Sequence, residues 1–576
     1  MIYTCGKSVV IRDIEEPANA DLYQQHVANA TAATYAPSGF YVASGDESGK
    51  LRIWDTVNAE HILANEFPVL SGKIHDIAWS GDSERIVVVG DGRERFGAAI
   101  LAKTGSSVGS ITGHSKTILS CSFKQNRPFR VATCSEDFSI GFHTGPPFKF
   151  AQGNQDHTRF VNCVRFSPDG TKFVAVASDM QGSVFDGKTG DKLGELSNAD
   201  PHKGTIYSCS WSADSSFLLT SSADKSCKIW DMSGETYECV QTFVLGSTRD
   251  DMQVACLWAG EHLISVSLDG TINYLNRDNP DEPIRRLAGH NKYTTALTYD
   301  AESSTILSGS YDGRIIAWDF DGWSSVMFSG DGHGSQVAGM DVVGDTLVSV
   351  GMDDTLCISS IADKTMGAPI KLDSTPTGVA ASQSTPGLFV ASHRGGLAVI
   401  RDGAVVSTLA LDNEPASVAI NHDDTQVAVG ARDGVFIYEL AGDTLNEVQA
   451  LKDAHRAALS SVSYSPDGSS LATCDTGRNI IVWDTTSFDA KVGAGKWCHH
   501  TARVNDIAWS PNGEYLASAS LDCDIRIWSL GNPSAKIRIP LGHNGGATGV
   551  VWISDSVIAT SGNDSSVKTW NIENLE

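Results

Sequence analysis

A pattern of one hydroxyl, one carboxylate and one indole side chain recurs along the whole chain. In residues 498–530 it consists of Ser518, Asp522 and Trp528, spaced by four and six residues. Three further sets keep this spacing: Thr220, Asp224 and Trp230; Ser308, Asp312 and Trp318; and Thr560, Asp564 and Trp570. A unit this short cannot bury both of its faces. It has to pack against neighbours of the same kind, so the chain is expected to be a repeat protein.

Each unit has the sequence pattern of a meander of short β-strands. In the clearest unit, alternating apolar residues predict strands at 504–509, 515–520 and 525–528, with turn residues between them. A histidine often opens the unit, as at His202, His290 and His543. Buried polar side chains need partners, so we expect the His, Ser/Thr, Asp and Trp side chains to form one hydrogen-bonded chain. The unit resembles the WD repeat of β-propellers.

The number of units predicts the architecture. Thirteen units follow one another at the spacing of about 40 residues that is typical of propeller blades, and residues 2–14 resemble part of one more. Single propellers have about four to eight blades, so fourteen blades favour two tandem seven-bladed rings in an all-β protein. The split falls near Pro283–Gly289. We therefore expect an N-terminal propeller at 1–287 and a C-terminal propeller at 288–576.

Both ends of the repeat array are expected to be incomplete. The last unit ends at Ile572, which leaves no outer strand for the final blade. The N-terminal fragment, with expected strands at 2–5 and 8–14, lacks an innermost strand. We therefore expect a shortened N-terminus and a weak seam in one or both rings.

Composition narrows the classes of partner and compartment. The formal charge of −26 disfavours nucleic acid as a partner, because phosphate binding needs basic surfaces. Neither a signal peptide nor a long apolar run is present in the sequence, so no membrane association is expected. The 12 cysteines contain no Cys-x-x-Cys pair. We expect free thiols in a reducing compartment, with no metal ion bound.

No catalytic constellation can be assembled from the sequence. Residues 182–189 match the phosphate-binding P-loop by letter, but that loop requires a strand before it and a helix after it. Here a strand at 183–185, a turn at 186–190 and a further strand are expected instead. We therefore expect a protein that is not an enzyme and that has no cofactor; a nucleotide-using enzyme is the third-ranked alternative.

Two irregular stretches depart from the regular unit. The first, residues 90–97, places Arg93, Glu94, Arg95 and Phe96 where a blade has a tight turn. An exposed Phe among charges is typical of an interface, whereas a Phe folded under its own blade would only stabilise the loop. Both interpretations of Phe96 remain open here.

The second stretch is residues 145–150 of the next unit. Two prolines lead into an outer strand in which Phe148 and Phe150 share one face and Lys149 takes the other. The two phenyl side chains therefore either pack on the neighbouring blade or bind a partner. The same unit carries Glu136 beside Asp137. Strand alternation places the Glu136 turn at the same end of the ring as the 93–96 loop, so Glu94 and Glu136 can face one partner together.

These stretches resemble the actin-interacting protein 1 family of WD-repeat proteins. The resemblance covers essentially the whole chain, and it is carried by GDGRERFG (90–97), NRPFR (126–130), GPPFKF (145–150), HTRFVNCVRFSPDG (157–170) and GSTRDDMQVACLW (246–258). It implies a protein without catalytic activity that binds actin filaments decorated with cofilin (actin-depolymerising factor). It also implies that the protein promotes severing and disassembly and restrains barbed-end regrowth.

The resemblance also implies which residues bind the partner. Glu94 falls on the family's acidic loop position, Glu136 falls where the family usually has Asp, and Phe150 is the last Phe of the Gly-Pro-Pro-Phe-Lys-Phe motif. The residues expected to bind cofilin or actin are Arg93, Glu94, Arg95, Phe96, Glu136, Lys149 and Phe150. We expect a monomer in the cytoplasm, on cortical actin structures. A general WD-repeat scaffold or adaptor is the alternative, although it leaves the two irregular stretches unexplained.

Overall fold

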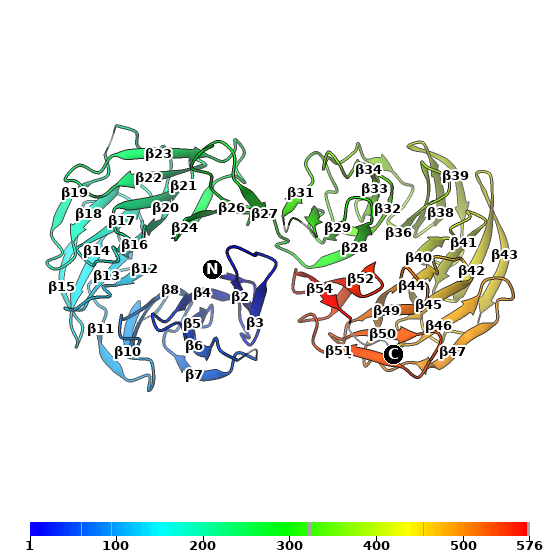
Figure 1. Cartoon of the computed structure of the whole chain (residues 1–576), viewed down its shortest axis with the longest axis horizontal. Coiled ribbons are helices and arrows are strands. Elements are labelled where there is room, and N and C mark those ends of the chain that lie inside the picture. Colours follow the sequence, from blue (N-terminus) through cyan, green and yellow to red (C-terminus); the bar gives the residue numbers. More distant parts are fainter. Residues whose placement is uncertain are drawn as a thin grey trace. The chain divides into compact units, whose positions relative to one another are not determined.

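The computed structural model describes residues 1–572 except 59, 94, 198, 321, 323 and 453. All regular elements among these described residues are β-strands. Consecutive strands within each group below, which semicolons separate, pair antiparallel. The chain divides into two compact units, Met1–Leu287 and Ala288–Glu576. In each unit the sheets lie around a common centre, with one edge strand of each sheet innermost (Figure 1).

Unit 1, residues 1–287, contains strands β1 to β27. They are β1 (Ile2–Cys5), β2 (Ser8–Arg12) and β3 (Ala20–Tyr23); β4 (Ala30–Tyr35), β5 (Tyr41–Asp46), β6 (Lys50–Asp55) and β7 (Leu63–Pro68); β8 (Ile74–Trp79), β9 (Arg85–Gly90), β10 (Gly97–Leu101) and β11 (Ser107–Ser110); β12 (Ile118–Phe123), β13 (Arg130–Ser135), β14 (Ile140–Thr144) and β15 (Lys149–Asn154); β16 (Val161–Phe166), β17 (Lys172–Ala177), β18 (Gly182–Asp186) and β19 (Lys192–Glu195); β20 (Ile206–Trp211), β21 (Phe217–Ser222), β22 (Ser226–Asp231) and β23 (Cys239–Val244); and β24 (Gln253–Ala259), β25 (His262–Ser267), β26 (Ile272–Tyr274) and β27 (Arg285–Leu287).

Unit 2, residues 288–576, contains strands β28 to β54. They are β28 (Thr294–Asp300), β29 (Thr305–Ser310), β30 (Ile315–Asp319) and β31 (Ser325–Met327); β32 (Val337–Val343), β33 (Thr346–Gly351), β34 (Thr355–Ser360) and β35 (Ile370–Lys371); β36 (Pro376–Ala381), β37 (Leu388–His393), β38 (Gly396–Arg401) and β39 (Ala404–Ala410); β40 (Pro415–Ile420), β41 (Gln426–Ala431), β42 (Gly434–Ala441) and β43 (Thr444–Lys452); β44 (Leu459–Tyr464), β45 (Ser470–Asp475), β46 (Ile480–Asp484) and β47 (Ala490–Trp497); β48 (Val504–Trp509), β49 (Tyr515–Ser520), β50 (Ile525–Ser529) and β51 (Lys536–Ile539); and β52 (Ala547–Ser554), β53 (Val557–Gly562) and β54 (Val567–Asn571).

The innermost strands of successive sheets pack on one another in chain order. In unit 2 this order runs from β28 through β32, β36, β40, β44 and β48 to β52, and β52 in turn packs against β28. In unit 1, β1 packs on β4, and Met1 and Tyr3 pack on Ile264 and Tyr274 of the last sheet. Each unit thus brings its first and last sheets together.

The second and third strands of each sheet carry the core. Strand β9, for example, is buried along nearly its whole length, whereas the outer strand β7 alternates between exposed and half-buried positions. The apolar clusters lie between successive sheets, as where Ile77 and Ile86 pack with Leu51 and Ile53 of the preceding sheet. Burial of apolar surface stabilises this packing of sheets by about 25 cal/mol for each Å² removed from water.

The structure bears on four sequence expectations. Residues 182–195 form β18, a turn and β19, so the segment that matches a P-loop by letter lacks the helix that such a loop needs. The N-terminal fragment contains a third strand, β3, which the sequence did not predict. Among the described residues, no helix has the length and apolarity that a membrane crossing requires. All twelve cysteines are free thiols.

Candidate partner-binding surface

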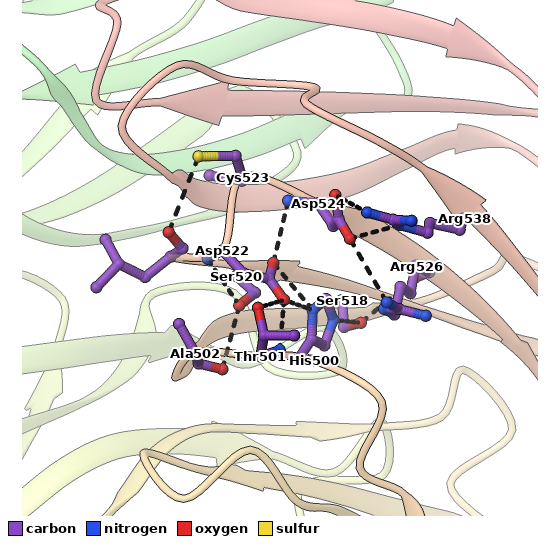
Figure 2. Close-up of polar contacts among 12 residues, drawn as sticks. His500, Thr501, Ala502, Ser518, Ser520, Asp522, Cys523, Asp524, Arg526 and Arg538 are labelled. Atoms are coloured by element: carbon purple, nitrogen blue, oxygen red, sulfur yellow. Dashed lines mark hydrogen bonds and ion pairs between the residues drawn. The ribbon is translucent and has the colours of Figure 1, made fainter.

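The repeated polar residues form the hydrogen-bonded chain expected of them. Figure 2 shows this chain in the sheet β48–β51, where Nε2 of His500 lies 2.8 Å from Oγ of Ser518 and Nδ1 lies 3.0 Å from Asp522. The indole N–H of Trp528 donates to the same Oγ at 2.9 Å. Burial alone would raise the pKa of Asp522, but hydrogen bonds from His500 and the Thr501 N–H outweigh it and hold that pKa below its usual range.

The same geometry recurs in other sheets. His202 bridges Thr220 and Asp224, and His543 bridges Thr560 and Asp564, with Nε2–Oγ1 distances of 2.8 Å in both. Each chain ties the turn between the second and third strands to the segment that enters the sheet. The network therefore holds these turns at one end of each unit, and its residues are occupied by that structural role.

The 91–96 loop is tied to the segment that precedes β8. The Asp91 N–H donates to Lys73 O at 2.8 Å, the Arg93 N–H to Ser71 Oγ at 3.2 Å, and the Arg95 guanidinium to Val69 O at 2.9 Å. The side chains of Arg93 and Arg95 are otherwise exposed. Glu94 lies outside the described residues. The described part of the loop thus carries two exposed cations and is held to the segment before β8 by these hydrogen bonds.

The sequence left two roles open for Phe96, an exposed interface residue or a packed residue that stabilises the loop. Its contacts in the structure are those of a packed residue. It is half-buried and packs against an apolar cluster that includes Ile111, Phe123 and Phe148. Its carbonyl accepts the Gly90 N–H at 2.9 Å, which closes the loop. Phe96 therefore anchors the loop, and the arginines are the exposed side chains among its described residues.

Glu136 lies on the neighbouring turn, between β13 and β14. It is half-buried, and its backbone N–H donates to Thr117 O at 3.1 Å. The Thr117 hydroxyl in turn donates to Asp91 at 3.0 Å. One residue, Thr117, thus joins the Glu136 turn to the 91–96 loop, which confirms that these two turns are neighbours at the same end of the unit.

An aromatic pair beside Glu136 was missed from the sequence. Phe138 and Phe160 are 36% and 42% exposed, and their ring centroids are 5.8 Å apart. The Lys116 ammonium lies 6.0 Å from the Phe138 ring. Phe138 has a φ of +70°, a conformation that costs a bulky residue about 1 kcal/mol or more. Some units have Gly at this position, such as Gly313, and others have a polar residue with the same positive φ, such as Lys225, so an aromatic residue in this turn is the signal that could have revealed Phe138.

Lys149 and Phe150 lie apart from these turns. Lys149 pairs with Thr144, at the end of β14 remote from Glu136, and its side chain is exposed. Phe150 is 41% exposed; its ring packs edge-on to His143 at 5.7 Å. A Cβ on Gly113 would lie 2.4 Å from that ring, so glycine is needed there. The structure thus joins the 93–96 loop with Glu136 but places Lys149 and Phe150 on a separate outer strand.

Phe148 and Phe150 have different environments although they are two residues apart. Phe148 is 1% exposed and forms a bridge with Gly109 of the preceding sheet, so it belongs to the core. His143 stands where other units have Trp, and Nε2 lies 3.0 Å from Thr112 O. Burial lowers the pKa of His143 to about 4, so the imidazole is neutral at pH 7.

Comparisons with known proteins agree with the repeat pattern. Seven segments match the family described as WD domain, G-beta repeat: residues 21–55, 105–142, 150–186, 194–231, 281–319, 446–484 and 494–529. The chain is 47% identical to the 66 kDa stress protein of Physarum polycephalum, over 100% of this chain and 95% of that protein. It is 42% identical to actin-interacting protein 1 of Drosophila melanogaster, over 100% and 94% of the two chains. WD repeat-containing protein 1 of Gallus gallus is 43% identical, over 99% and 94%.

Proposed function

This chain belongs to the family of actin-interacting protein 1 and WD repeat-containing protein 1, and from that premise we propose that it binds actin filaments and works with cofilin to sever and disassemble them. In this proposal it also restrains regrowth at barbed ends, acts by binding without catalysis, and is a cytoplasmic monomer on cortical actin structures. The full-length similarity to a relative named for its interaction with actin supports the partner.

We propose further that each unit is a seven-bladed propeller. The circular packing order of the innermost strands supports this arrangement in unit 2, and the contact of Met1 and Tyr3 with the last sheet supports it in unit 1. A propeller presents the turns between second and third strands together on one rim. That rim is where a large flat partner such as a filament can contact several turns at once.

The observation that carries the proposal is the joined pair of turns in unit 1. The exposed arginines of the 91–96 loop, the Glu136 carboxylate and the Phe138–Phe160 pair lie on neighbouring elements. Exposed aromatics beside Arg are typical of protein interfaces, and a rigid backbone lowers the entropy cost of binding. Phe150 and Lys149 provide a second, separate contact in the proposal.

Sedimentation of actin filaments tests the proposal. Filaments are pelleted with and without cofilin, and with and without this protein. We expect more actin in the supernatant only when cofilin and the protein are both present. An unchanged supernatant in every combination contradicts the proposed function.

Variants test the surface in the same assay. Glu94→Ala, Glu136→Ala and Phe150→Ala are each expected to raise the concentration needed for half of the effect by about tenfold, which is the loss of one interface anchor. Glu84→Ala removes an exposed carboxylate at the opposite end of the β8–β9 pair and serves as the control. Circular dichroism melting separates a binding defect from unfolding. A folded Glu136→Ala protein with full activity would remove that residue from the surface.

A further inference from the structure

Two buried thiols of unit 1 face each other across neighbouring sheets. Cys163 lies on β16 and Cys209 on β20, two innermost strands that pack together, and their sulfur atoms are 3.9 Å apart. The two residues are 4% and 2% exposed. Their apolar surroundings include Val174, Leu218 and Trp230. Strands β16 and β20 lie on the inner side of the unit, toward its centre (Figure 1).

Two other thiols of the same unit, one buried and one half-buried, have different partners. Sγ of Cys121 contacts Val87 O at 3.8 Å, and Sγ of Cys256 contacts Leu219 O at 3.5 Å. Thiols that donate to a carbonyl behave as small core residues. Cys163 and Cys209 instead contact each other.

From this geometry we propose that Cys163 and Cys209 form a two-coordinate site for a soft monovalent cation, Cu(I) in the cell and Ag(I) as its analogue. Soft thiolate ligands select such ions. With metal–sulfur bonds of about 2.3 Å, two sulfurs on one ion lie from about 3.8 Å apart at the tetrahedral angle to about 4.6 Å when collinear. The observed 3.9 Å falls in that range, so the ion enters with sulfur movements of less than about 1 Å.

The number of ligands selects against other metals. Zn²⁺ in structural sites takes four ligands. Among the described residues, no group of three or more His, Cys, Asp or Glu side chains is placed to hold a metal ion. A pair of thiolates without further ligands suits an ion that accepts two sulfurs in line.

The charge of the complex follows from the protons that binding releases. Binding releases one proton from each thiol to solvent, so two thiols and one M⁺ give a complex with a net charge of −1. Arg165 lies two residues along β16 and forms an ion pair with Asp76, with Nη1 2.8 Å from Oδ2.

Two substitutions compatible with the fold test the site. Cys163 follows the bulge of its strand, and the equivalent residues of β12 and β20 are Ser120 and Ser208, so Cys163→Ser keeps a residue type that this position accepts. Cys209→Val introduces the residue type found at the equivalent Val164 of β16. Cys121→Ser, at another buried thiol on an innermost strand, is the control.

The full chain is titrated anaerobically with Cu(I), and separately with Ag(I), against a competing chelator. We expect one tight site per chain, weakened at least 100-fold by Cys163→Ser and by Cys209→Val and unchanged by Cys121→Ser. X-ray absorption at the copper edge of the one-equivalent wild-type complex is expected to show two sulfur neighbours and no nitrogen.

Two results overturn the proposal: a tight site that survives both substitutions, or an absorption spectrum with other ligands. The spectrum uses the wild-type chain, so it decides the matter even if a variant fails to fold. The site is independent of the proposed function, because Cys163 and Cys209 lie in the interior and the actin assay contains no Cu(I) or Ag(I).

Discussion

At the scale of single residues, the repeated network is a set of buried polar atoms that satisfy one another. Ser518 is the centre of its set, since Oγ meets both the His500 imidazole and the Trp528 indole. His500 and Trp528 are each 1% exposed, so water cannot replace a lost partner. Removing one atom at the centre therefore leaves two buried groups without their partner, which costs more than one ordinary hydrogen bond.

Replacing Ser518 with Ala is expected to lower the free energy of unfolding of unit 2 by about 2–4 kcal/mol, because two buried groups lose their partner. Urea denaturation followed by tryptophan fluorescence measures the change. Ser534→Ala, the same chemical change at an exposed position before β51, is expected to have an effect below about 0.5 kcal/mol. Equal effects of the two substitutions would contradict the central role of Ser518.

At the scale of elements, the innermost strands of unit 2 are linked by a carboxylate. Asp506 on β48 accepts the Val550 N–H of β52 at 3.1 Å and the Ser461 hydroxyl of β44 at 3.1 Å. Burial raises the pKa of Asp506 to about 6, although these hydrogen bonds act in the opposite direction. The folded state therefore binds this proton more tightly than the unfolded chain, where an Asp has a pKa of about 3.9.

The raised pKa of Asp506 gives its contribution to stability a definite sign. Stability from this group is fully present below about pH 4 and is lost as the pH rises through about 6. Between pH 7 and pH 5 the group adds about 1 kcal/mol. Asp506→Asn is expected to lack this gain. Denaturation curves of the variant at pH 7 and pH 5 should therefore differ less than those of the wild type. Parallel pH profiles of variant and wild type would show that Asp506 titrates normally.

The strand pattern was predictable from the sequence, whereas its relation to the signature residues was not. Alternation and turn residues predicted the strands at 504–509 and 515–520, and both agree with β48 and β49. The sheets β36–β39 and β40–β43 have four strands each although their sequences keep little of the signature. Apolar alternation, as in Val427 and Val429, is sufficient to bury a sheet between its neighbours.

The candidate surface was predictable only in part. Neighbouring units and strand alternation correctly placed the 93–96 loop beside Glu136. The different burial of Phe148 and Phe150 could not be inferred, because alternation treats residues two apart as equivalent. A register shift between Phe142 and His143 and the bridge from Phe148 to Gly109 create the difference, and both depend on contacts between strands.

At the scale of the whole molecule, the two compact units each have their own apolar clusters. Units with separate cores can unfold separately, so a single free energy of unfolding does not describe such a chain. A substitution inside one unit is then expected to act on that unit alone.

Hydrogen–deuterium exchange measures this independence. Ser518→Ala is expected to raise exchange in peptides from unit 2, while peptides from unit 1, such as those covering β9 and β17, keep their wild-type protection. Thr220→Ala removes the equivalent hydroxyl in unit 1 and is expected to give the reverse result. Faster exchange throughout the chain in both variants would mean that the units unfold as one.

The His–Asp link that holds a network turn in place has a consequence for protein engineering. In the turn after β13, His114 and Ser115 hold Asp137 in place, while Glu136 and Phe138 on either side of it take no part in the hydrogen bonds among these three residues. The neighbouring positions can therefore be varied without loss of the sheet that carries them, with proline and β-branched residues left out at 138, where φ is +70°. A library varied at 136 and 138, with the network kept constant, would turn this rim into a display scaffold for selecting new binding specificities.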